Sequence, residues 1–205
     1  MSKISDNQDL LNFYNSTLSD IRTTQIAEDE GGNSEQLFTR MAVDLLAEAG
    51  ETENVRVAYD EKALGSRNQH KINGYAISEN YETIDLYVTI YNGEDMPVRM
   101  SKEEIEKSVR RISNFFKKAI GNEFVHEIDE SSQIFDFART IYQSEELKTQ
   151  LVRVNAIILT DGTYGGQAPM SGNIAGFPIY YRVSITHNWV PVSTFNDFGY
   201  TDELL

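Results

Sequence analysis

The sequence predicts an α/β (α+β) fold in which helices flank a mixed β-sheet. Apolar residues recur at helical spacing in the first fifty residues and again between residues 101 and 150. Between these regions, residues 84–91 alternate between apolar and polar side chains, which is typical of a strand with unlike faces. A further strand-like region at 152–185 returns the chain to the sheet, so helices and strands are interleaved.

Two helices are expected before the first strand. The first runs from about Asp6 to Thr23, and the second follows a cap at Asn33 or Ser34. Gly50 marks the end of the second helix, because glycine is common just after a helix C-terminus. The apolar stripe of the second helix consists of Leu37, Phe38, Met41, Ala42, Leu45 and Leu46.

Three strands follow, at 55–59, 71–77 and 83–92. In the third, apolar Ile84, Leu86, Val88 and Ile90 alternate with Asp85, Tyr87, Thr89 and Tyr91. Asp85 is out of place by propensity, because acidic residues are depleted in strands. Such a residue indicates either a polar sheet face or a functional site.

The second half of the chain begins with a helix and ends with strands. Ser101 and Glu104 form a capping box that opens a helix to about residue 120. Another helix is expected at 132–143, extended by 145–150, and strands at 152–160 and 177–185. A glycine-rich loop joins these two strands, and a short strand is expected at 189–192. The element order is therefore ααβββααββ.

Composition restricts the classes of protein that fit. The chain has 205 residues, 40% of them hydrophobic, and no run approaches the ~18 apolar residues of a membrane span. It contains 0 cysteines, which excludes a disulfide scaffold and a thiolate metal site. The net charge of −14 opposes a general nucleic-acid surface. Since MSKISDNQDLL lacks the apolar segment of a secretory signal, we expect a cytoplasmic protein.

The domain organisation is expected to have three parts. Residues 1–32 form an N-terminal helix and an acidic loop, residues 33–195 an α/β domain, and residues 196–205 a tail. The tail reads as the start of a further segment, so we expect the chain to belong to a longer protein.

Four segments resemble the N-terminal region of the AIPR family, the abortive-infection phage-resistance proteins of bacteria. They are DLLAEAGE (44–51), INGYAISENYETIDLYVTIYNG (72–93), the helix after Met100, and VRVNAIILTDG with GNIAGFPIYYRVSI. The likeness spans roughly residues 34–192. Members of that family are usually longer, so the resemblance implies an N-terminal domain alone or a short relative.

The resemblance also implies a restriction-endonuclease-like, PD-(D/E)xK core. Such a nuclease holds Mg²⁺ or Mn²⁺ with acidic groups on neighbouring strands, assisted by a lysine. In this sequence Asn73 occupies the first acidic place and Asp85 the second, which makes them the implied metal ligands. Tyr87 stands where the lysine is expected, and Lys71 or Lys62 is a candidate to replace it.

A helix acid is common in such enzymes, and Glu35 and Glu48 are the candidates. Aligning DLLAEAG with the usual helix pattern puts Thr39 at that place. The candidate catalytic set is therefore Asp85, Asn73, Lys71 and Glu48, and its departures from the pattern favour a degenerate site. The alternative is a wet sheet face on which Asp85 pairs with Lys71 or Arg56, with a bulge or kink at Asn73-Gly74.

Basic residues on the helix at 101–120 are the candidate nucleic-acid contacts: Arg110, Arg111, Lys117 and Lys118. Three glutamates on the same helix dilute this charge, so a solvated face is the competing interpretation. His70, His126 and His187 have no metal-ligand spacing and are expected to be surface or hydrogen-bonded histidines.

Three functions remain open, of which the third, a stand-alone small-molecule enzyme, has only an acidic cleft in its favour and no motif. The first is a metal-dependent nuclease domain, or its inactive descendant, in anti-phage defence. The second is a non-catalytic module that forms a homodimer or binds a partner through the glycine-rich loop and strand 177–185. Tyr180 and Trp189 favour the second function, because aromatic residues are enriched at interfaces.

Overall fold

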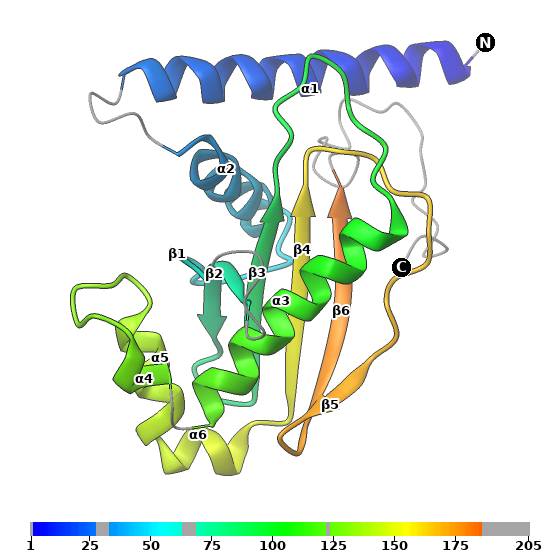
Figure 1. Ribbon diagram of the computed structural model, residues 1–205. Helices are drawn as coiled ribbons and strands as arrows, with labels where there is room; N and C mark the ends of the chain where they lie inside the picture. Colours follow the sequence, from blue (N-terminus) through cyan, green and yellow to red (C-terminus); the bar gives the residue numbers. More distant parts are fainter. Residues whose placement is uncertain (1, 28–32, 63–68, 122–123, 186–205) are drawn as a thin grey trace.

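The computed structural model describes residues 2–27, 33–62, 69–121 and 124–185 (Figure 1). These residues form a six-stranded mixed sheet with helices on both faces, which confirms the predicted fold class. The strands are β1 (Arg56–Glu61), β2 (Lys71–Ile77), β3 (Thr83–Ile90), β4 (Arg153–Thr160), β5 (Gly172–Ile174) and β6 (Phe177–Ile185). Their order across the sheet is β1-β2-β3-β4-β6-β5.

Strand direction divides the sheet into two parts. β1, β2 and β3 pair antiparallel, whereas β4 and β6 run parallel to β3. The parallel pairing of β3 with β4 requires a crossover, because parallel neighbours cannot be joined by a tight turn. The crossover consists of α3 (Lys102–Ile120), α4 (Phe124–Glu127), α5 (Phe135–Gln143) and α6 (Glu145–Gln150).

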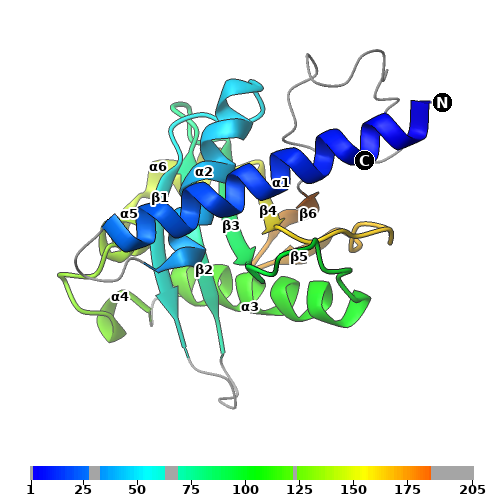
Figure 2. The same ribbon diagram turned by 90° about the horizontal axis from the view of Figure 1, so that it is seen from above.

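The two faces of the sheet carry different helices (Figure 2). α1 (Ser2–Ala27) and α2 (Ser34–Glu48) lie on one face, and α3 lies on the other. α5 joins α3, where Phe137 stacks on Tyr75 of β2 with ring centroids 4.0 Å apart. We call the two surfaces the α2 face and the α3 face.

Alternation along β3 separates two hydrophobic cores. Ile84, Leu86 and Val88 pack beneath α3, in the core that includes Phe115 and Phe116 of that helix. Tyr87 points to the α2 face, where it packs with Phe38 and its neighbours. Tyr87 and Thr89 are each only 1% exposed, so the interpretation of this face as wet is wrong at both residues.

Most local signals act as expected. Gly50 has φ 73° just past α2, and the Ser101–Glu104 capping box opens α3. The order ααβββααββ was incomplete, because the helical block contains four helices and β5 forms a hairpin with β6. The register irregularity between Val57 and Asp60 of β1 lies opposite Asn73, because Val57 pairs with Gly74 and Asp60 pairs with Ile72. The bulge or kink expected at Asn73-Gly74 is therefore found at this place in the β1–β2 pair. The strand expected at 189–192 lies outside the described residues.

Asp161, just after β4, fixes the loop that follows β3. Its buried carboxylate accepts hydrogen bonds from the backbone N–H groups of Asn92 and Gly93 and from the side chain of Asn92. α1 binds the same loop, because Tyr14 donates to the carbonyl of Glu94 at 2.8 Å. These contacts join α1, the loop after β3 and the end of β4.

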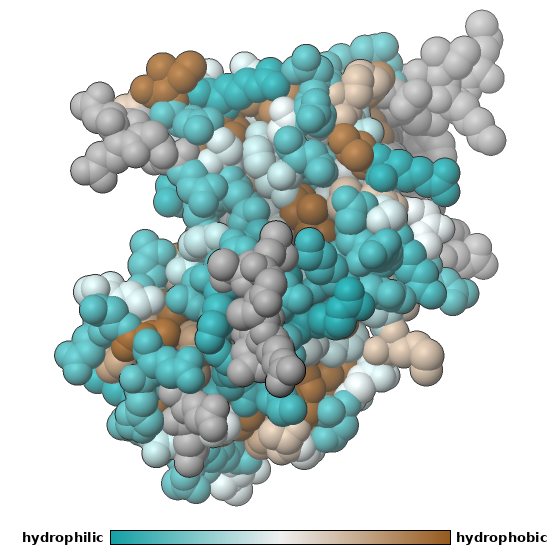
Figure 3. All heavy atoms as spheres, viewed as in Figure 1, coloured by the Kyte–Doolittle hydropathy of each residue, from teal (hydrophilic) through white to brown (hydrophobic). Residues whose placement is uncertain are grey.

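The surface that carries α3 is mainly hydrophilic (Figure 3). Its apolar patches are small and separate within the part of this surface that the structure describes. Among the described residues, no helix is both long enough and apolar enough to cross a membrane.

Candidate functional site

Lys71 and Asn73 of β2 meet Glu35 of α2 on the α2 face. They stand two residues apart on one strand, so their side chains point to the same side of the sheet. Lys71 Nζ lies 2.6 Å from Glu35 Oε2, and Asn73 Nδ2 donates to Glu35 Oε1 at 2.7 Å. Both oxygens of the Glu35 carboxylate are therefore engaged.

The side chains of Asn73 and Lys71 also bind the backbone of β3. The β2–β3 register extends from Ile77↔Ile84 to Gly74↔Tyr87. Beyond it, the N–H of Thr89 donates to Asn73 Oδ1 at 2.8 Å, and Lys71 Nζ donates to the carbonyl of Thr89 at 2.9 Å. Side chains thus satisfy backbone groups in the buried interior, where unpaired ones would be costly.

Two threonines complete this cluster. Thr39 Oγ1 donates to the carbonyl of Glu35 at 2.7 Å and lies 2.7 Å from Thr89 Oγ1. Asn33 caps α2 by accepting from the N–H of Glu35, which places Glu35 in the first helical turn. A carboxylate is favoured there by the positive end of the helix dipole. Glu35, Thr39, Lys71, Asn73 and Thr89 are referred to below as the Glu35 network.

The Glu35 network does not fit a nuclease-type Mg²⁺ or Mn²⁺ site. Mg²⁺ is usually bound through one or two carboxylates, with waters and substrate phosphates completing its oxygen shell, but both oxygens of Glu35, the single carboxylate of this network, are already bound by Lys71 and Asn73. The Asn73 carbonyl that would replace a carboxylate accepts from Thr89 instead. Among the described residues, no group of three or more His, Cys, Asp or Glu could hold a metal ion.

Next to Lys71, the edge strand β1 carries a second polar group. Glu61 is the register partner of Lys71, and it accepts hydrogen bonds from Tyr59 and from Arg111 of α3. Burial opposes ionisation of Glu61, but these hydrogen bonds outweigh it and lower the pKa of its carboxyl. The Arg111–Glu61 pair joins α3 to the sheet edge.

Asp85 lies apart from the Glu35 network. It shares the face of Thr89 but stands four residues earlier in β3, which corresponds to roughly 13 Å along a strand. Asn155 Nδ2 of β4 donates to Asp85 Oδ1 at 2.6 Å. Its partner is therefore Asn155, and not Lys71 or Arg56 as the alternative interpretation expected. Burial raises the pKa of the Asp85 carboxyl.

Glu48 also lies apart from Lys71 and Asn73. It is the last residue of α2, exposed and roughly 20 Å along the helix from Glu35. The predicted catalytic set lacks Glu35, although this residue shares a helical face with buried Thr39 and Leu46. The helical spacing of Glu35 from these buried residues is the sequence feature that could have identified it. Lys62 is exposed just after β1, and its N–H donates to the carbonyl of His70.

The four basic residues proposed to contact nucleic acid do not form one exposed surface. Arg110 and Lys117 of α3 are exposed. Arg111 is 9% exposed and bound to Glu61, and Lys118 has 12% of its side chain exposed, 3.6 Å from Glu127. Only half of the set is therefore available to a phosphate backbone.

The histidines within the described residues are not grouped. His70 is 4% exposed, its Nε2 lies 2.5 Å from Asp60 Oδ2, and its ring packs on Phe115 and Phe124. His126 is exposed and contacts the ring of Tyr142. His187 lies outside the described residues.

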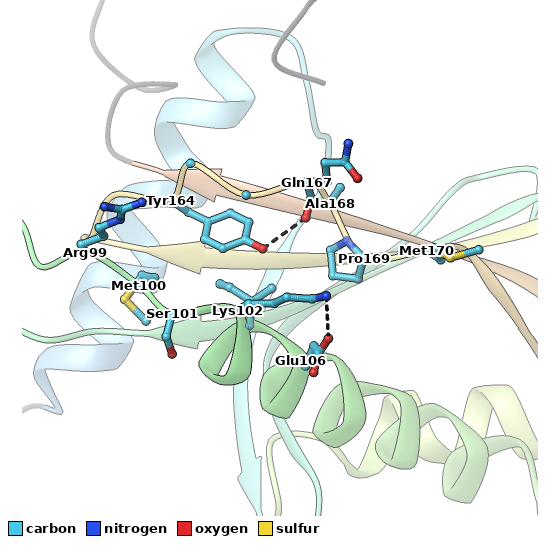
Figure 4. A pocket seen from close by; sticks show the side chains of 13 residues that line it. Arg99, Met100, Ser101, Lys102, Glu106, Tyr164, Gln167, Ala168, Pro169 and Met170 are labelled. Carbon is cyan, nitrogen blue, oxygen red and sulfur yellow. Dashed lines mark hydrogen bonds and ion pairs between the residues drawn. The ribbon is translucent and has the colours of Figure 1, made fainter.

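The glycine-rich loop forms one wall of a cavity of about 720 Å³, and the start of α3 forms the other (Figure 4). Tyr164, Pro169 and Met170 line it from the loop. Lys102 faces them from α3 and pairs with Glu106 at 3.6 Å. No member of the Glu35 network lines this cavity, so the two features are separate.

Comparison with known proteins identifies a family. The model for the abortive infection phage resistance protein N-terminal domain matches residues 38–184. The match begins within α2 and extends into β6, so it includes Lys71, Asn73, Asp85 and Thr89. No match was found among curated proteins or among solved structures. On the match to residues 38–184, the chain belongs to the abortive infection phage resistance protein family and carries its N-terminal domain.

Proposed function

We propose that this domain binds a partner of the phage-resistance protein and does not cleave nucleic acid. The domain would derive from a nuclease whose metal site has become an internal ion-pair network. The observation that carries the proposal is the position of Lys71 Nζ, between Glu35 Oε2 at 2.6 Å and the carbonyl of Thr89 at 2.9 Å. An ammonium group therefore occupies the position beside the carboxylate that a divalent cation would need.

The charges of the Glu35 network support this proposal. A nuclease site of this kind gathers acidic groups, and bound cations offset their repulsion. Here one carboxylate is balanced by one ammonium, and Asn73 replaces a second negative charge with an amide. The network is thus electrically balanced without a metal.

A calorimetric titration of the domain with Mn²⁺, together with a cleavage assay on single- and double-stranded DNA and RNA, tests this proposal. The variants are Glu35→Gln and, as a matched control, Glu48→Gln at the exposed end of the same helix. We expect no saturable binding and no cleavage in any of the three proteins. Binding or cleavage that Glu35→Gln abolishes and Glu48→Gln retains would overturn the proposal.

Metal-dependent cleavage by Glu35, Lys71 and Asn73 is the second candidate function. It is favoured by the exposure of Glu35, 22% of whose side chain remains in contact with solvent. A substrate and its ion can therefore reach the carboxylate if Lys71 moves away. The same titration distinguishes the two functions, because only this one requires Glu35-dependent binding of Mn²⁺.

A further inference from the structure

Three polar residues form a row across the α2 face, near the starts of β3 and β4. Asp85 is the register partner of Asn155, and Asn155 is the register partner of Tyr180. Register partners on neighbouring strands point to the same face of a sheet, roughly 4.8 Å apart. Tyr180 is 49% exposed, and Asp85 and Asn155 are partly exposed. These residues are called the Asp85 row.

The Asp85 row presents two hydrogen-bond acceptors side by side. Asn155 Nδ2 donates to Asp85 Oδ1 at 2.6 Å, which fixes the orientation of both groups. Asp85 Oδ2 and Asn155 Oδ1 have no hydrogen-bond partner within the described part of the chain. Neither atom is among the buried polar atoms that lack a partner, which is consistent with access from solvent. A ligand with two adjacent donors would match this pair.

Arginines on both sides of the row restrict the charge of that ligand. Arg153 and Arg182 both act electrostatically on Asp85. Arg182 is paired with Glu51, whereas Arg153 is exposed and has no ion pair among the described residues. The charge of Arg153 offsets that of Asp85, so the row offers little net attraction to a cationic ligand such as a guanidinium of another protein. A neutral donor edge attached to an anion fits better.

We propose that the Asp85 row binds one guanine base of a single-stranded nucleic acid. The ring would stack on Tyr180, since exposed aromatic side chains on sheets bind unstacked bases in this way. The N1–H and N2–H groups of guanine would donate to Asp85 Oδ2 and Asn155 Oδ1. Arg153 would contact the adjoining phosphate. Adenine lacks this pair of donors, so the row discriminates between the two purines.

This site is independent of the Glu35 network and does not rest on the proposed function. The two sites share a sheet face, but Asp85 lies four residues before Thr89 on β3. The net charge of −14 disfavours sequence-independent attraction of a polyanion. Local recognition of the base should therefore dominate the measured affinity.

The test uses fluorescence anisotropy with the labelled pentamers d(TTGTT) and d(TTATT) in low salt. We expect the guanine pentamer to bind about tenfold more tightly to the wild type, as a two-hydrogen-bond base contact provides. In Asp85→Asn, the amide group of the new side chain faces the guanine donors, so the preference should fall to within about twofold. Tyr180→Ala should weaken both pentamers at least about fivefold through lost stacking.

Lys107→Ala on α3 is the control, because it removes an exposed cation on the opposite face. It should leave the guanine preference unchanged. Equal binding of the two pentamers by the wild type, binding of neither, or a guanine preference that survives in Asp85→Asn would each overturn the proposal. Circular dichroism of each variant checks that its fold is retained.

Discussion

Lys71 and Glu35 form a 2.6 Å ion pair that is largely shielded from solvent, with 8% and 22% of their side chains exposed. The pair joins β2 to α2 across 36 residues of sequence. Removing one partner of a shielded pair leaves an uncompensated charge, which costs more than the pair itself contributes. The packing of α2 on the sheet therefore depends on both residues.

Lys71→Met is expected to lower the free energy of unfolding by about 3 kcal/mol, because it leaves the Glu35 carboxylate without its counterion. Urea denaturation measures this change. Lys102→Met is the control, since the Lys102–Glu106 pair is 81% and 47% exposed. The control should change stability by less than about 0.5 kcal/mol. A loss below about 1 kcal/mol in Lys71→Met would contradict the expectation.

The double variant Glu35→Gln with Lys71→Met is expected to be more stable than the sum of the single changes allows. The glutamine introduced by Glu35→Gln can still accept a hydrogen bond from Asn73, but it carries no charge that needs a counterion. A double-mutant cycle should therefore give a coupling energy of at least about 1 kcal/mol. Additive losses would mean that the two charges do not stabilise one another.

Much of the fold could be predicted because its signals are local. Period-2 alternation in β3 and the capping box of α3 each depend on a few neighbouring residues. The shared face of Lys71 and Asn73 followed from the same alternation. The shortest elements could not be predicted, because α4 and β5 contain too few residues for a periodic signal.

The candidate site could be predicted only in part, because its contacts are distant in sequence. Glu35 meets Asn73 across 38 residues, and the phase of α2 over the sheet is a property of packing. Asp85 meets Asn155 across 70 residues through the parallel pairing of β3 with β4. Alternation placed Asp85 and Thr89 on one face, but it could not show that Thr89 is buried there while Asp85 remains partly exposed.

Asp161→Asn is expected to loosen the loop after β3. The carboxylate of Asp161 is 3% exposed and accepts from the N–H of Gly93 at 2.8 Å. An amide replaces one acceptor oxygen with a donor, so stability should fall by about 2 kcal/mol. Hydrogen exchange at Asn92 and Gly93 should accelerate. Asp95→Asn, at an 87% exposed side chain of the same loop, should change neither quantity.

The last prediction concerns the pH dependence of stability at Asp85. Burial raises the pKa of this carboxyl above its ordinary value of 3.8. Between the two pKa values, the folded protein holds more protons than the unfolded chain, so the free energy of unfolding falls as pH rises. The contribution of Asp85 is fully present below the unfolded pKa and is lost as pH rises through the folded pKa.

Asp85→Asn cannot ionise, so this variant should escape that loss while its amide still accepts a hydrogen bond from Asn155. The melting temperature of the variant relative to the wild type should therefore rise between about pH 3 and about pH 7. Thermal denaturation across this range measures the difference. A flat or falling difference for Asp85→Asn would mean that Asp85 ionises in the folded protein as readily as in the unfolded chain.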